Sequence, residues 1–204
     1  MLLSSSIPYA IGILIGITYI TYKLIAKFIL KREVNILIDL ILGSFIVYIF
    51  AIIGLTLFPL PIGAEHLTVL RGTQSDSSIT FNILPFTSIL DTIVTQEISS
   101  NTYQIVRQLG GNVLLFIPIG IYVPLLFKNK FKNVLIFGFI LSLAIEIFQL
   151  IISMFIDFNY RITDIDDIIL NTSGAILGFL ISKYLGFQKI DDMISSNVKK
   201  VNLN

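Results

Sequence analysis

Cysteine is absent from this sequence of 204 residues, and histidine occurs once, as His66 in a polar stretch. The lack of cysteine excludes disulfide bonds, thiolate chemistry and cysteine-ligated metal sites. A single histidine does not favour a Ser-His-Asp triad, and it cannot form the cluster that a typical zinc site needs. A carboxylate site for Mg²⁺ or Ca²⁺ stays open, because these hard cations take oxygen ligands. We name no metal ligands, and the sequence indicates no particular cofactor.

Charged residues are also scarce. They make up 13% of the chain, whereas a soluble domain carries about a quarter. The chain is 55% hydrophobic, with a mean hydropathy of +0.89. A net charge of +1, without a basic patch interleaved with aromatic residues, argues against nucleic acid as a partner. Several apolar runs approach the roughly 20 residues that cross a bilayer core, so the sequence predicts an integral membrane protein in contact with lipid.

Five apolar stretches predict an all-α fold, a polytopic membrane helix bundle. They cover residues 7–29, 34–58, 111–127, 133–152 and 165–185. We divide the chain into an N-terminal span with its basic connection (1–33), a main membrane domain (34–186) and a cytoplasmic C-terminal tail (187–204).

The long segment between the second and third stretches is not a plain polar loop. Ile83, Phe86, Leu90 and Ile93 recur in it at near-helical spacing. We predict that residues 82–94 form an interfacial or re-entrant helix against the outer leaflet, with Pro85 in its first turn.

Polar residues on the last two predicted helices reach one level of the bundle. Glu146 lies about six residues, or about 9 Å, from the outer end of the fourth helix. A carboxylate at this depth costs a few kcal/mol to insert unless it is paired, protonated or hydrated. The sequence therefore predicts an outward-facing cavity with Arg161 at its entrance. Its predicted lining residues are Asn112, Glu146, Gln149, Asp164, Asp167 and Asn171.

Each of these residues also has a purely structural interpretation. Asp164 suits a helix N-cap, and Asp167 would favour the helix dipole. Glu146, Gln149 and Asn171 could form interhelical hydrogen bonds, and Arg161 could neutralise the acids. Gly174 and Gly178 have the spacing of a close helix contact.

Four motifs together resemble the VanZ-like family. They are NILPF (82–86), NVLLFIPIG (112–120), AIEIFQL (144–150) and YRITDIDDIILNTSGAILGF (160–179), and the resemblance covers about residues 45–184. The family is named for a protein associated with teicoplanin resistance in Gram-positive bacteria. The resemblance implies a polytopic membrane protein with a role in the cell envelope, but it supplies no catalytic residues. By motif, it points to Asn82, Pro85, Asn112, Pro118, Glu146, Gln149, Arg161, Asp164, Asp166, Asp167 and Asn171.

Two functions are compatible with this pattern. The first is binding of a polar lipid or cell-wall-precursor headgroup at the outer leaflet, with an effect on glycopeptide susceptibility. The second is an enzyme acting on a lipid-linked substrate through the carboxylates of Glu146, Asp164, Asp166 and Asp167, of which Glu146 and Asp167 are the acid/base or metal-ligand candidates. A transporter is disfavoured because no inverted repeat is visible and the charge lies on one side rather than at the midplane.

The distribution of basic residues predicts the orientation of the chain. Of its 14 lysines and arginines, 11 lie around the first and third connections and near the C-terminus. Arg71, Arg107 and Arg161 lie on the other side. The positive-inside rule then places the N-terminus outside and the C-terminus in the cytoplasm.

Cysteine labelling tests this orientation without background, because the chain has no cysteine of its own. We expect Lys130→Cys to be protected from a membrane-impermeant maleimide added to intact cells, whereas His66→Cys should react. Labelling of Lys130→Cys from outside would show that the orientation is reversed.

Overall fold

In a computed structural model, residues 2–73, 79–98, 106–127 and 130–187 are described, and most of them are helical. The helices are α1 (Ser6–Phe28), α2 (Ile36–Leu57), α3 (Ala64–Thr73), α4 (Thr87–Ile98), α6 (Gly111–Phe127), α7 (Phe131–Ile156) and α8 (Ile165–Tyr184), with a π-helical turn, η1 (Val106–Gly110), before α6. The strands are β1 (Leu2–Leu3), β2 (Leu60–Pro61), β3 (Phe81–Asn82) and β4 (Thr163–Asp164). The predicted all-α fold is confirmed. Most of the predicted C-terminal tail lies outside the described residues.

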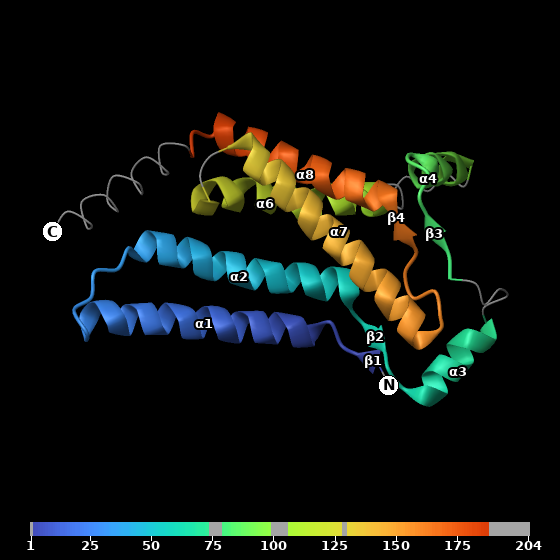
Figure 1. Cartoon of the computed structure of the whole chain (residues 1–204), viewed down its shortest axis with the longest axis horizontal. Coiled ribbons are helices and arrows are strands. Elements are labelled where there is room, and N and C mark those ends of the chain that lie inside the picture. Colours follow the sequence, from blue (N-terminus) through green and yellow to red (C-terminus); the bar gives the residue numbers. More distant parts are fainter. Residues whose placement is uncertain (1, 74–78, 99–105, 128–129, 188–204) are drawn as a thin grey trace.

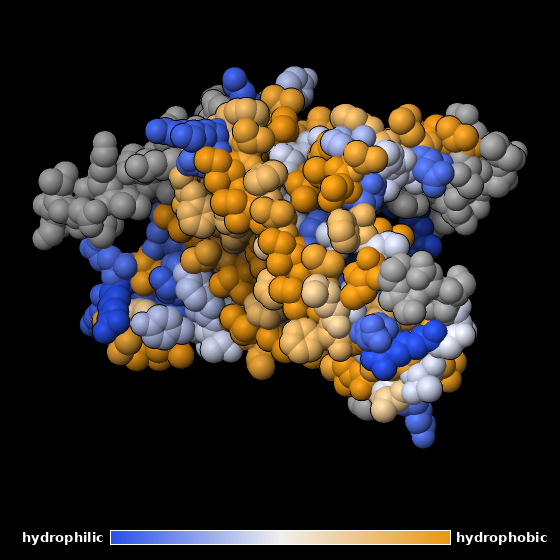
Figure 2. All heavy atoms as spheres, turned by 45° about the vertical axis from the view of Figure 1, so that its right-hand side comes forward, coloured by the Kyte–Doolittle hydropathy of each residue, from blue (hydrophilic) through white to orange (hydrophobic). Residues whose placement is uncertain are grey.

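Four helices, α1, α2, α7 and α8, are long and apolar enough to cross a membrane. The remaining predicted span, residues 111–127, corresponds to α6, which has 17 residues and a length of about 25 Å, slightly less than a typical hydrocarbon core. Apolar side chains cover the middle of the face in Figure 2, and hydrophilic residues gather mainly toward its two ends. The chain is a multi-pass membrane protein.

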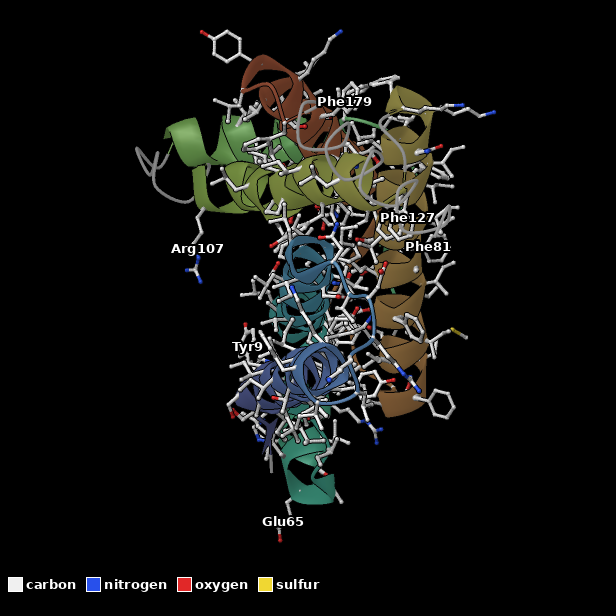
Figure 3. The ribbon with its side chains drawn as sticks, turned by 90° about the vertical axis from the view of Figure 1, so that its left-hand side faces the viewer. Tyr9, Glu65, Phe81, Arg107, Phe127 and Phe179 are labelled. Carbon is white, nitrogen blue, oxygen red and sulfur yellow. The ribbon has the colours of Figure 1, made fainter. Side chains whose placement is uncertain are left out.

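The helices form two groups that meet at α2. Helices α6, α7 and α8 pack on one another, and α1 packs along α2, which also contacts α6 and α7. Figure 3 views α1 and α2 nearly end-on. In this view α6 and α8 lie above α2, and α7 runs along the right side. The core of the larger group is apolar and includes Phe116, Ile119, Val123, Val134 and Ala175.

Glycines let α6 and α8 approach until their backbones touch. A Cβ atom added at Gly178 would lie 1.9 Å from the carbonyl oxygen of Ile117, and one at Gly174 would lie 2.1 Å from that of Val113. A Cβ at Gly120 would meet the Ala175 carbonyl at 2.1 Å. The Gly-x-x-x-Gly spacing on α8 therefore serves helix packing.

The short strands, α3, α4 and the starts of α6 and α8 lie at one end of the bundle, which we call the loop end (Figure 1). Parallel pairing of β3 with β4 joins the segment before α4 to the start of α8, with Asn82 opposite Asp164. We call the opposite end, where α6 turns into α7, the lysine end. Lys27, Lys130, Lys132 and Lys183 lie in the helix termini and turns there.

Two predicted boundaries are wrong. Helix α4 begins at Thr87, so Pro85 precedes it. The side-chain oxygen of Asn82 instead accepts hydrogen bonds from the Leu84 amide and the Thr87 hydroxyl, which form a turn, and Phe86 has a positive φ of 69°. Helix α7 continues to Ile156 instead of ending near residue 152, so Glu146 lies ten residues from its end.

The contact between α6 and α8 predicts that Gly178→Ala is strongly destabilising. The added methyl group meets backbone rather than a flexible side chain, so we expect a loss of about 3 kcal/mol in the free energy of unfolding. Gly111→Ala is the matched control, since nothing lies within 4 Å of its added Cβ. Thermal unfolding of both variants in detergent measures the difference, and equal stability would contradict the close contact.

Candidate functional site

Asp164 joins three separate segments at the loop end. Its side chain caps α8 by accepting a hydrogen bond from the Asp166 amide at 2.9 Å, and it also accepts one from the Asn82 side-chain amide at 3.1 Å. Its own backbone amide donates to the Glu146 carboxylate at 2.9 Å. The first partner belongs to α8, the second to the segment before α4, and the third to α7. Asp164 therefore fixes the relative positions of these three parts.

Asp166 holds the start of α4. One carboxylate oxygen accepts a hydrogen bond from the Phe86 amide at 2.5 Å, and the other accepts one from the Ile89 amide at 3.1 Å. The side chain is 1% exposed. A carboxylate at this position satisfies helix N-terminal amides and favours the helix dipole. Asp166 is therefore a cap supplied to α4 from another helix.

Glu146 and Gln149 are buried on the α7 face that meets the other helices. Glu146 is 2% exposed, and the amide nitrogen of Gln149 donates to the Thr56 carbonyl at 3.0 Å. This bond connects α7 to the end of α2. These contacts, together with the hydrogen bond that Glu146 accepts from Asp164, fit the prediction that both residues form interhelical hydrogen bonds.

Asn171 lies deeper in the α7–α8 interface. Its side-chain nitrogen donates to the Ser142 hydroxyl at 2.9 Å, whereas its side-chain oxygen is buried and has no hydrogen-bond partner among the described residues. Thr163 and Thr172 also bury hydroxyl oxygens for which the described part of the chain supplies no hydrogen-bond partner. Buried groups of this kind are commonly satisfied by ordered water.

A cavity of about 690 Å³ opens beside this network. Helix α4, η1, the start of α6, α7 and the start of α8 all contribute to its wall. The charged residues that line it are Asp91, Arg107, Arg161, Asp164, Asp166 and Asp167. Its size lies within the range of about 300 to 1,000 Å³ that is typical of small-molecule sites.

The charged residues differ in how far the fold already uses them. Asp164 and Asp166 accept backbone hydrogen bonds that hold the fold together. Asp167 is half-buried and accepts a hydrogen bond from the side chain of Asn112, in the first turn of α6. Arg161 is exposed and donates to the Leu55 carbonyl at 3.2 Å, a bond that uses one of the five N–H donors of a guanidinium. Asp167 and Arg161 are therefore the predicted residues best placed to meet a ligand.

The structure brings together most of the site predicted from sequence. Asn112, Gln149, Arg161, Asp164, Asp166 and Asp167 line the cavity. Asn82, Glu146 and Asn171 do not line it, because their side chains are directed into contacts between elements. The expectation that Glu146 and Asn171 line the cavity is wrong in this respect.

Two charged lining residues, Asp91 and Arg107, are not among the site residues predicted from sequence. Asp91 lies on the α4 face that also presents Ser88 and Thr92 to the cavity, at helical spacing. This polar spacing, opposite the apolar face of the segment, is the sequence signal that points to Asp91. Arg107 extends from η1 before α6, as Figure 3 shows, and no local pattern predicts where that turn lies.

The carboxylates do not form a compact metal-binding group. Among the described residues, no three or more His, Asp or Glu side chains are close enough together to hold a metal ion. We therefore assign no metal ligand in this cavity.

Comparison with known proteins identifies the family of this chain. Residues 45–186 match the model of the VanZ/LLP1 family, from within α2 to just beyond α8. The chain belongs to the VanZ/LLP1 family. The matched part of this VanZ/LLP1 chain contains every lining residue named above and excludes α1.

The chain is 37% identical over 93 residues to Protein VanZ of Enterococcus faecium, and the match covers 43% of this chain and 54% of that protein. The chain thus spans about half the length of this relative. No solved structure matches the chain.

The role of Asp166 predicts a local effect on α4. Asp166→Ala removes both carboxylate bonds to the first turn of α4, and hydrogen bonds to charged groups contribute about 1.5 to 3 kcal/mol each. We expect amide hydrogen exchange in residues 87–94 to become at least about tenfold faster. Glu65→Ala, on the exposed surface of α3, should leave this exchange unchanged. Unchanged exchange in Asp166→Ala would show that the carboxylate does not hold α4.

Proposed function

We propose that this protein binds the polar headgroup of a lipid or lipid-linked cell-wall precursor in the loop-end cavity. The observation that carries the proposal is that two guanidinium groups, Arg107 and Arg161, line the same cavity as the half-buried Asp167. Arginine binds phosphate or carboxylate oxygens through paired N–H groups, and a carboxylate accepts hydrogen bonds from hydroxyl or amine groups. A headgroup that combines an anionic group with such donors fits this lining.

The apolar surface of the α4 region supports a site at headgroup depth. Ile83, Leu84, Phe86, Leu90 and Val94 are all more than half exposed. Helix α4 thus has one polar face toward the cavity and an apolar surface that would be favourable in a membrane interface. With this surface in the lipid, the cavity mouth lies among the headgroups.

We further propose that the loop end faces outward and that binding there alters glycopeptide susceptibility. The orientation rests on the distribution of lysine and arginine, and the phenotype on the family resemblance. An outer-leaflet site would give the protein access to envelope precursors after they have crossed the membrane.

A second candidate is an enzyme acting on a lipid-linked substrate. The observation that favours it is that Asp167 lines the cavity and accepts a hydrogen bond from Asn112. The buried Glu146 accepts a hydrogen bond from the Asp164 backbone amide, three residues before Asp167. In this alternative, Asp167 would exchange a proton with the substrate and Glu146 would position the start of α8. Release of product from a lipid-linked substrate would favour the enzyme, whereas binding without turnover would favour the first proposal.

Substitutions in the cavity test the binding proposal. We use phosphoethanolamine as the probe because it joins a phosphate to an amine and has no acyl chain. We expect Arg161→Gln and Asp167→Asn each to weaken its binding about tenfold or more, since each removes a charged hydrogen-bond partner. Isothermal titration calorimetry of the purified protein measures the change in affinity. The cellular assay is complementation of a glycopeptide-susceptibility phenotype by variants present in the membrane at equal levels.

Asp157→Asn provides the matched control. Asp157 ends α7 outside the cavity with a φ of 49°, a conformation that asparagine also adopts readily. It should bind phosphoethanolamine as the unmodified protein does. Equal affinity in Arg161→Gln, Asp167→Asn and the unmodified protein would exclude the proposed headgroup site.

A further inference from the structure

A second cavity lies at the lysine end, between α6 and α7. Its volume is about 380 Å³. Its apolar lining residues are Val123 and Phe127 from α6, and Ile136, Phe137, Ile140, Leu141 and Ala144 from α7. It shares no lining residue with the headgroup cavity.

This cavity is a groove on the lipid-facing surface rather than a closed core void. Phe127 is 50% exposed, Ile136 is 44% exposed and Ile140 is 58% exposed. Figure 3 shows Phe127 beside the first turns of α7. The polar lining residue Asn133 donates its side-chain amide to the Phe127 carbonyl at 3.0 Å. This bond satisfies a carbonyl at the end of α6, so the groove presents mainly hydrocarbon to an occupant.

Two lysines lie close in sequence to Asn133, the polar residue of the groove. Lys130 immediately precedes α7, and Lys132 lies in its first turn; both side chains are exposed. The first turn of α7 adds the positive end of the helix dipole. An apolar groove that ends in lysines and helix N–H groups is complementary to a hydrocarbon chain attached to an anion.

We propose that the α6–α7 groove binds an anionic phospholipid, with an acyl chain along Phe127, Ile140 and Ala144 and its phosphate over Lys130 and Lys132. The acyl chain supplies apolar contact, and the charge at the lysine end selects the headgroup. This site is independent of the proposed headgroup site, because it lies at the other end of the bundle and uses none of its residues.

Native mass spectrometry of the full chain can test this proposal. The probes are phosphatidylglycerol and phosphatidylcholine with identical acyl chains, so that the two lipids differ in headgroup alone. We expect the unmodified protein to bind phosphatidylglycerol at least about fivefold more strongly. Lys130→Ser combined with Lys132→Ser should abolish this preference, while Lys27→Ser, at the same end but on α1, should retain it.

A groove-filling variant tests the acyl-chain part separately. Ala144→Phe should reduce binding of both lipids, and Leu135→Phe, on an exposed α7 position outside the groove, should not. The lysine variants change exposed side chains, so they test the site even if Ala144→Phe fails to fold. Equal binding of the two lipids by the unmodified protein, or an unchanged preference in the double lysine variant, would overturn the proposal. Neither outcome bears on phosphoethanolamine binding at the loop end.

Discussion

The capping of α8 by Asp164 is the interaction on which the loop end depends. A helix N-terminus leaves amide groups that need acceptors, and within a membrane bundle water is a poor source of them. The Asp164 carboxylate accepts such an amide hydrogen bond for α8, and it also accepts one from the Asn82 side chain. The backbone amide of Asp164 donates to the Glu146 carboxylate. The segment before α4 is thereby joined to the α7–α8 pair. Asp166, two residues later, then supplies the cap for α4. The wall of the cavity is a consequence of these two caps.

This arrangement separates the acidic residues by role. Four acids crowd the start of α8 and the facing part of α7, and their number alone suggested a reactive cluster. Three of them accept backbone hydrogen bonds: Glu146 and Asp166 accept them from other elements, and Asp164 accepts one at the start of its own helix. Asp167 instead contacts a side chain at the cavity wall. The functional candidates therefore narrow to Asp167 and the two arginines, and the other acids act by positioning them.

Much of this architecture could be predicted from the sequence, because apolar length and helical spacing depend on local pattern. The fifth predicted stretch, 165–185, and the third, 111–127, match α8 and α6 closely, and the Gly-x-x-x-Gly contact is present. The polar level shared by Asn112, Asp164 and Asp167 also follows from spacing. What the sequence could not provide is long-range pairing. Asp166 bonds amides 77 and 80 residues earlier in the chain, and no periodicity encodes such a contact. The predicted depth of Glu146, about six residues from the end of its helix, is wrong because α7 continues to Ile156, ten residues beyond Glu146.

The central claim is that the segment before α4 is fixed to the start of α8, and a cysteine cross-link tests it most directly. Phe81 and Thr163 are opposed across the β3–β4 pair, and the chain has no other cysteine to interfere. The double variant Phe81→Cys, Thr163→Cys should form an intramolecular disulfide on mild oxidation in membranes. Phe81→Cys paired with Lys130→Cys, at the lysine end, should not. Failure of the first pair to cross-link, in protein that inserts normally, would contradict the proposed arrangement of the loop end.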